Sequence, residues 1–136
     1  MNKLALALSL ILASCTGGAR AGAVVVAKSS ALGPMSTEEA RRVFLGLQRN
    51  VGDQTMAVIF QRGGAPREEF NTKVLGKTGS ELTAYMAARI FAGRTVPPTE
   101  VGNDDDVKRT LGSSSGAIGY ISDAAVDESV RVLLKY

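Results

Sequence analysis

The apolar positions of this chain fall in short stretches separated by polar turns that contain glycine or proline. Residues 23–27 form a continuous run of small and β-branched side chains, which is typical of a strand buried on both faces. Three later apolar stretches, at 55–61, 117–121 and 130–134, predict further strands. Helical segments fall between the strands, so the pattern predicts an α/β fold, a mixed sheet flanked by helices.

Four segments carry the signals of helices. The first begins with a capping box at Ser36, and its apolar positions 40, 43, 44 and 47 share one face. The second has proline in its first turn, followed by acidic residues that complement the helix dipole. Capping residues also precede the other two. The predicted helices run from Ser36 to Gly46, Pro66 to Gly76, Ser80 to Gly93 and Asn103 to Leu111.

The N-terminal residues form a separate segment. Lys3 precedes an apolar run over 4–14 that is too short to span a bilayer and is typical of a secretory signal. Two cleavage sites compete. The triplet at 19–21 predicts a signal peptide of residues 1–21, whereas residues 12–15 are similar to a bacterial lipobox, which predicts removal of 1–14 and lipidation of Cys15. Either site leaves an exported protein with one domain, 22–136.

Composition excludes several classes of function. The 136 residues include no histidine and one cysteine, which removes histidine-based catalysis, histidine-ligated metal sites and an internal disulfide. Aromatic residues make up 5% and basic residues are scattered, so we expect no nucleic-acid partner. Without residues 1–21 the chain has 14 basic and 13 acidic residues, so its charge gives no evidence for an acidic partner. We expect neither enzyme activity nor a cofactor.

Three polar clusters have candidate chemistry. Asp104-Asp105-Asp106 is similar to a calcium-binding run, but consecutive positions diverge around a helix, so we interpret it as an acidic first turn and expect no metal. The serines 113–115 offer hydroxyls and are a secondary candidate for an oxyanion, although such a run is typical of a loop from a helix into a strand. Tyr120 is interpreted as a core residue of a short strand.

The most informative site lies where the strand 55–61 leads into the helix at Pro66. Arg62 and the Gly63-Gly64 turn lie at the carboxyl end of a strand, where open α/β sheets bind ligands. The amides of the helix's first turn, from Ala65 to Arg67, point outward and favour an anion, and both arginines add charge. We expect Arg62 to contribute more, because Arg67 can swing into solvent. The competing interpretation is a tight glycine turn with two solvated arginines.

Three segments occur in a recognisable order: Met35 to Gly46, the Arg62-Gly63-Gly64 turn with residues 67–70, and Gly116 to Tyr120. Together they resemble the phosphate-binding, PstS-like substrate-binding proteins of ABC importers, and more narrowly their short single-lobe periplasmic relatives. The resemblance implies one lobe of the type II periplasmic-binding-protein fold. It also implies a periplasmic location, phosphate or a similar oxyanion as ligand, and an ABC permease as partner.

The loop after the second strand differs from the family pattern. Phosphate binders carry Arg and then Gly-Ser-Gly-Thr there, whereas this chain has Gly64-Ala65-Pro66 in place of Ser-Gly-Thr, so the hydroxyl donors are missing. Full-length relatives enclose the ligand between two lobes, and residues 22–136 supply one. We therefore expect roughly millimolar phosphate affinity, with a second lobe from a dimer or another protein. The alternative is an interaction module or envelope lipoprotein that binds no ligand.

Overall fold

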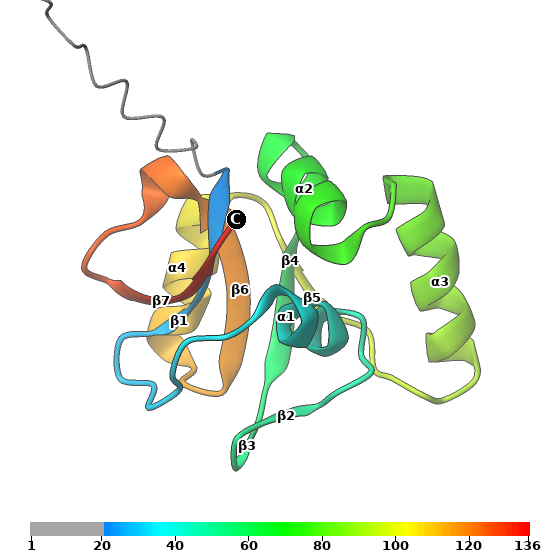
Figure 1. Cartoon of the computed structure of the whole chain (residues 1–136), viewed down its shortest axis with the longest axis horizontal. Coiled ribbons are helices and arrows are strands. Elements are labelled where there is room, and N and C mark those ends of the chain that lie inside the picture. Colours follow the sequence, from blue (N-terminus) through cyan, green and yellow to red (C-terminus); the bar gives the residue numbers. More distant parts are fainter. Residues whose placement is uncertain (1–20) are drawn as a thin grey trace, which may run out of the picture.

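The computed structural model describes residues 21–136, so the predicted signal segment and Cys15 lie outside the described residues. Figure 1 shows a central sheet with helices on either side. The sheet has five strands in the order β5-β4-β6-β1-β7. Strand β4 runs parallel to β5 and β6, while β1 is antiparallel to β6 and β7, which confirms the predicted mixed sheet. The strand bounds are β1 Gly22–Ala27, β4 Ala57–Gln61, β5 Thr99–Val101, β6 Ala117–Ser122 and β7 Val130–Lys135.

Helices cover both faces of this sheet. The helix bounds are α1 Thr37–Phe44, α2 Ala65–Phe70, α3 Gly79–Phe91 and α4 Asp104–Ser113. Alternate residues of β1 enter different cores: Val24 and Val26 pack in the cluster that includes residues of α1 and α2, whereas Ala23 and Val25 pack with residues of α4. All four side chains are fully buried, which confirms the prediction of a strand enclosed on both faces.

An aromatic cluster attaches α1 and α2 to the sheet. Phe70 at the end of α2 stacks on Tyr120 of β6, with ring centroids 4.0 Å apart and planes 9° from parallel. Phe44 of α1 meets Phe70 edge-on at 4.7 Å, and Phe60 of β4 meets Tyr120 at 5.9 Å. Such pairs contribute about 0.5–1.5 kcal/mol each beyond the burial of their area. They fix the position of α2 relative to the ends of β4 and β6, and Tyr120 is a core residue as predicted.

Two details of the predicted elements are wrong, the placement of Leu47 and the start of the second strand. The first helix ends at Phe44, and Leu47 lies outside it with half of its surface exposed, instead of on its buried face. The left-handed stop at Gly46 is confirmed, because Gly46 adopts a φ of 75°. The stretch 55–61 is also divided. Thr55 belongs to a small hairpin of β2 Asn50–Val51 and β3 Gln54–Thr55, and β4 begins two residues later.

The remaining differences concern α3 and β5. Thr78, not Ser80, caps α3: its hydroxyl accepts a hydrogen bond from the Glu81 amide at 3.4 Å. Strand β5 was not predicted, because three residues after two prolines carry too little pattern. It exists because its backbone pairs with β4, an interaction that only the tertiary structure supplies. No helix within 21–136 is long and apolar enough to cross a membrane.

Candidate oxyanion site

The junction of β4 and α2 has the geometry of a strand that leads directly into a helix. Gly64 adopts a φ of 86°, a conformation that a side chain would strain, and it stands immediately before α2. Pro66 lies in the first turn, as predicted. The helix continues without a break into a π-helical segment, η1 Asn71–Leu75, and ends at Gly76 with a φ of 67°. The helical segment from Ala65 to Leu75 thus points its N-terminus at the carboxyl edge of the sheet.

Arg67 is held in place by three different groups. Its Nη1 donates to the carbonyl oxygen of Gln61 at 2.7 Å and lies 3.5 Å from a carboxylate oxygen of Glu100. Its guanidinium carbon lies 5.7 Å from the centre of the Phe60 ring. The side chain is 19% exposed, so the expectation that it swings into solvent is wrong. Helical side chains point back toward the N-terminus, which directs Arg67 over the end of β4.

Arg62 is the more exposed of the two arginines. Its backbone N–H donates to the carbonyl of Val101 at 2.9 Å, which extends the pairing of β4 with β5. Its guanidinium makes one long contact, 3.4 Å from Nη2 to the carbonyl oxygen of Glu100. Within 21–136 it forms no ion pair. Its charge is therefore open to a ligand or solvent.

The predicted site residues line two different cavities. A cavity of about 400 Å³ adjoins the turn and is lined by Gly63, Gly64, Arg67, Glu68, Asn71, Thr72, Lys77, Thr78 and Gly79. Arg62 instead lines a cavity of about 540 Å³ under α3. Arg67 lies between the two and lines both, while Ala65 lines neither.

The cavity beside the Gly63-Gly64 turn, named the polar cavity below, contains donors that the sequence analysis missed. Thr72 brings a hydroxyl and Lys77 an ammonium group, whereas Glu68 opposes an anion and the Thr78 hydroxyl already donates to the Glu81 carboxylate at 3.0 Å. The loop that follows Gly76 brings Lys77 and Thr78 back toward the Gly63-Gly64 turn. The glycine after the predicted helix was the only sequence signal for this return. Asn71 lines the same cavity, and its buried Oδ1 has no hydrogen-bond partner among the described residues.

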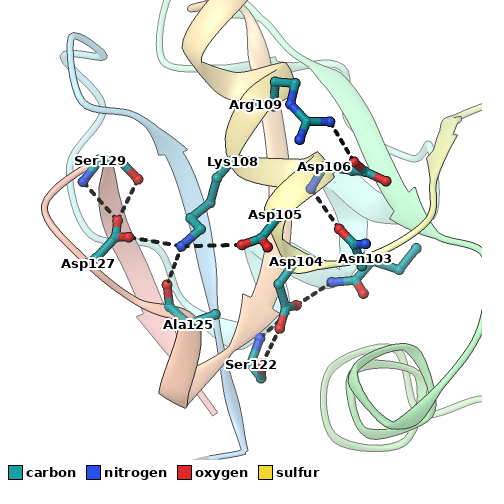
Figure 2. Close-up of polar contacts among 11 residues, drawn as sticks. Asn103, Asp104, Asp105, Asp106, Lys108, Arg109, Ser122, Ala125, Asp127 and Ser129 are labelled. Atoms are coloured by element: carbon teal, nitrogen blue, oxygen red, sulfur yellow. Dashed lines mark hydrogen bonds and ion pairs between the residues drawn. The ribbon is translucent and has the colours of Figure 1, made fainter.

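A buried network lies next to the junction, where the ends of β4, β6 and α4 meet. The side-chain amide of Gln61 donates to Asp104 at 2.7 Å and to the carbonyl of Tyr120 at 3.0 Å. Asp104 also accepts from the backbone N–H of Ser122 at 3.2 Å and from its hydroxyl (Figure 2). Burial raises the pKa of the Tyr120 phenol to about 12. The network joins the strand ends and places the backbone carbonyl of Gln61 that accepts from Arg67.

The acidic run at the start of α4 has structural partners in every position. Figure 2 shows the three carboxylates pointing in different directions. Asp105 faces Lys108 at 3.8 Å, and Asp106 pairs with Arg109 at 2.8 Å. Asn103 caps the helix by accepting from the Asp106 amide. Within residues 21–136, no group of three or more acidic, histidine or cysteine side chains is arranged to hold a metal ion.

Lys108 connects α4 to the segment before β7. Its ammonium group donates to Asp127 at 2.9 Å and to the carbonyl of Ala125 at 3.1 Å (Figure 2). Hydrogen bonds from the Ser129 hydroxyl and from Lys108 lower the pKa of Asp127 well below its usual range. The hydrogen bond to Asp127 in turn raises the pKa of Lys108. These contacts attach α4 to the segment before β7 at the protein surface.

The serine run 113–115 does not reach the junction. It precedes β6, and the carbonyl of the next residue, Gly116, accepts from the N–H of Ala57 at the start of β4. Because β4 and β6 are parallel, the run lies at the opposite edge of the sheet from Arg62. The structure therefore removes it as a secondary oxyanion candidate.

Comparison with protein-family models and with curated proteins finds no match. Solved structures do match. An ABC-type phosphate transport receptor from Vibrio cholerae superposes with a TM-score of 0.67 at 21% identity, over 84% of this chain and 45% of that one. A putative phosphate ABC transporter substrate-binding protein with bound phosphate from Clostridium perfringens gives 0.66 at 21% identity, over 84% and 44%. PstS from Borrelia burgdorferi gives 0.63 at 14%, over 84% and 46%.

These likenesses establish the fold. The chain has the architecture of a PstS-like lobe, as the sequence predicted, and spans less than half the length of the receptors it matches.

Proposed function

We propose that this chain is an exported solute-binding protein of the ABC-uptake type that binds phosphate or a similar oxyanion in the polar cavity beside the β4–α2 turn. The observation that carries the proposal is the placement of Arg67, which is fixed at the opening of the Gly63-Gly64 turn in a lobe of receptor-like fold. One of the structural neighbours is described with bound phosphate.

The chemistry of the cavity supports an anion that makes several separate hydrogen bonds. Arg67 has five N–H donors, of which the contacts above use few. The first turn of α2 adds the positive end of the dipole and the Arg67 amide, since Pro66 has no N–H and the Glu68 amide donates to the Gly64 carbonyl. The Thr72 hydroxyl and the Lys77 ammonium group supply donors in place of the hydroxyls that the loop lacks. The cavity is open to solvent and Glu68 is part of its lining. We therefore expect a phosphate dissociation constant of roughly 1 mM, about −4 kcal/mol.

A second candidate is an interaction module that binds no oxyanion. The observation that favours it is the replacement of the loop hydroxyls by Gly64-Ala65-Pro66. In that case a dimer, another lobe-bearing protein or a permease would be the partner. A lipid anchor on Cys15 would hold the lobe at a membrane surface.

Calorimetric titration of the purified protein with phosphate distinguishes the two candidates. Arg67→Ala should weaken binding by about tenfold, a loss of about 1.4 kcal/mol. Arg62→Ala should weaken it less, because Arg62 lines the neighbouring cavity. The control is Arg109→Ala, an exposed arginine on α4 with its own acidic partner, which should change nothing. Absence of binding up to tens of millimolar phosphate, or binding indifferent to Arg67→Ala, would favour the interaction module.

A further inference from the structure

A largely apolar cavity lies between α3 and the edge formed by β4 and β5. Its volume is about 540 Å³, and its apolar lining includes Phe60, Leu82, Met86, Ile90, Pro97 and Pro98. A second cavity of about 270 Å³ shares Met86, Pro97 and Pro98 with it. Cavities of 300–1,000 Å³ with mostly apolar walls are typical sites for small molecules.

Helix α3 leaves this space open because little of it packs on the body of the protein. Leu82 is its only buried residue out of 13, and Phe91 is 96% exposed. Leu82, Met86 and Ile90 recur at four-residue spacing and face the cavity along one side of the helix. Figure 1 shows α3 at the side of the molecule, joined to the rest through the segments at its two ends. A helix gains most of its stability from packing an apolar face, and here the space beside that face is a cavity.

The charged residues of the cavity leave one cation unpaired. Arg62, Arg67 and Glu100 are its three charged lining residues. Glu100 pairs with Arg67 at 3.5 Å, whereas Arg62 forms no ion pair within 21–136. The charged part of the lining therefore carries a net charge of +1 beside an apolar wall.

The geometry points to a binding site for a small apolar carboxylate, with its hydrocarbon part under α3 and its carboxylate at Arg62. The site shares Arg67 with the polar cavity but differs from it in the rest of its lining, since Gly63, Gly64 and Lys77 do not line it. A hollow between a helix and a sheet edge suits a small ligand better than a second copy of the chain, because a flat protein surface would leave the space empty. The carboxylate and the guanidinium form a charge-assisted pair, in which Arg donates two parallel hydrogen bonds.

Titration with octanoate, followed by amide chemical shifts, tests the proposal. Octanoate should bind with shifts on α3 and around Arg62, octan-1-ol at least tenfold more weakly, and acetate without detectable saturation. Ala87 is exposed and lines the cavity, so Ala87→Trp adds a large ring to the lining and should weaken octanoate at least tenfold. The matched control is Ala88→Trp, an exposed alanine on the same helix that does not line the cavity and should change affinity less than twofold. Arg62→Gln should weaken octanoate about tenfold and leave octan-1-ol unchanged.

Phosphate serves as the independent readout. Ala87→Trp should leave phosphate affinity unchanged, so failure of this site and failure of the phosphate site are distinguishable. The proposal is overturned if octanoate does not bind, if Ala87→Trp and Ala88→Trp behave alike, or if octan-1-ol binds as tightly as octanoate. It is also overturned if the protein self-associates and Ala87→Trp abolishes that association, since the occupant would then be a second copy.

Discussion

Gln61 of β4 and Tyr120 of β6 are joined by two hydrogen bonds of 3.0 Å each. The backbone N–H of Gln61 donates to the Tyr120 hydroxyl, and the Gln61 side-chain amide donates to the Tyr120 carbonyl. The backbone pairing of these strands is confined to their first residues, Ala57 with Ala117 and Val58 with Ile118. The two side chains therefore connect the strands at the end where Arg62 and the glycine turn begin.

The buried phenol of Tyr120 predicts a loss of stability in alkali. Burial raises its pKa from the usual 10 to about 12, so the folded state keeps the proton that the unfolded state loses. This contribution is complete below pH 10 and falls, by about 2 kcal/mol, as the pH rises to 12. Burial raises the pKa of Tyr136 in the same direction. Urea unfolding across this interval measures the loss. Tyr120→Phe should reduce it, with Tyr136 supplying the remainder, and a curve independent of pH would contradict the prediction.

Removing the Gln61 side chain should destabilise the junction. Gln61→Leu keeps the approximate volume and leaves the Tyr120 carbonyl and Asp104 each short of a donor. We expect a loss of about 1–3 kcal/mol in the free energy of unfolding. The control is Gln54→Leu in the exposed hairpin strand β3, which should change stability by less than about 0.5 kcal/mol. Equal effects of the two substitutions in urea titrations would show that the network contributes nothing.

Gly119 is required where α4 crosses β6. A Cβ at this position would lie 2.8 Å from Cγ1 of buried Val107. Gly119→Ala should therefore cost about 1–3 kcal/mol. Gly112→Ala, on α4 itself, meets nothing within 4 Å and should stabilise by about 0.5–1 kcal/mol. Adding Val107→Ala to Gly119→Ala should recover part of the loss, and a double-mutant cycle without coupling would contradict the close approach.

The start of α3 is set by Thr78. Thr78→Val removes the hydroxyl that accepts from the Glu81 amide and should cost about 1 kcal/mol. Ser80→Ala, inside the helix, should have little effect. Hydrogen exchange of the α3 amides reports this change directly, because so few residues of α3 are buried. If Ser80→Ala cost more stability than Thr78→Val, Ser80 would be the cap, as the sequence predicts, and not Thr78.

Export predicts a shortened mature protein. The apolar run ends at Cys15 and a second cleavage site follows at Ala21, so the chain recovered from the envelope should begin at Cys15 or Gly22. Intact mass decides between them, since a diacylglycerol increment on Cys15 selects the lipoprotein. A mass that retains residues 1–14 would contradict export.

Local sequence determined the parts of the fold whose signals lie within a few residues. The valine run of β1, the caps at Ser36 and Asn103, and the Gly64-Pro66 start of α2 were predicted correctly, because capping, turn geometry and β-branched runs are local properties. The α/β class followed from the order of these elements.

Only the tertiary structure decided which residues share a cavity. Arg62 and Arg67 are five positions apart, yet Arg62 is open to solvent. Arg67 is fixed by Gln61, Phe60 and Glu100, and Glu100 belongs to strand β5, far along the chain. In the same way, the return of the chain after Gly76 brings Lys77 and Thr78 to the glycine turn. The strand β5 and the cavity beneath α3 depend on how distant segments pack. The sequence pattern does not predict that packing, because each contributing segment is short and locally ambiguous.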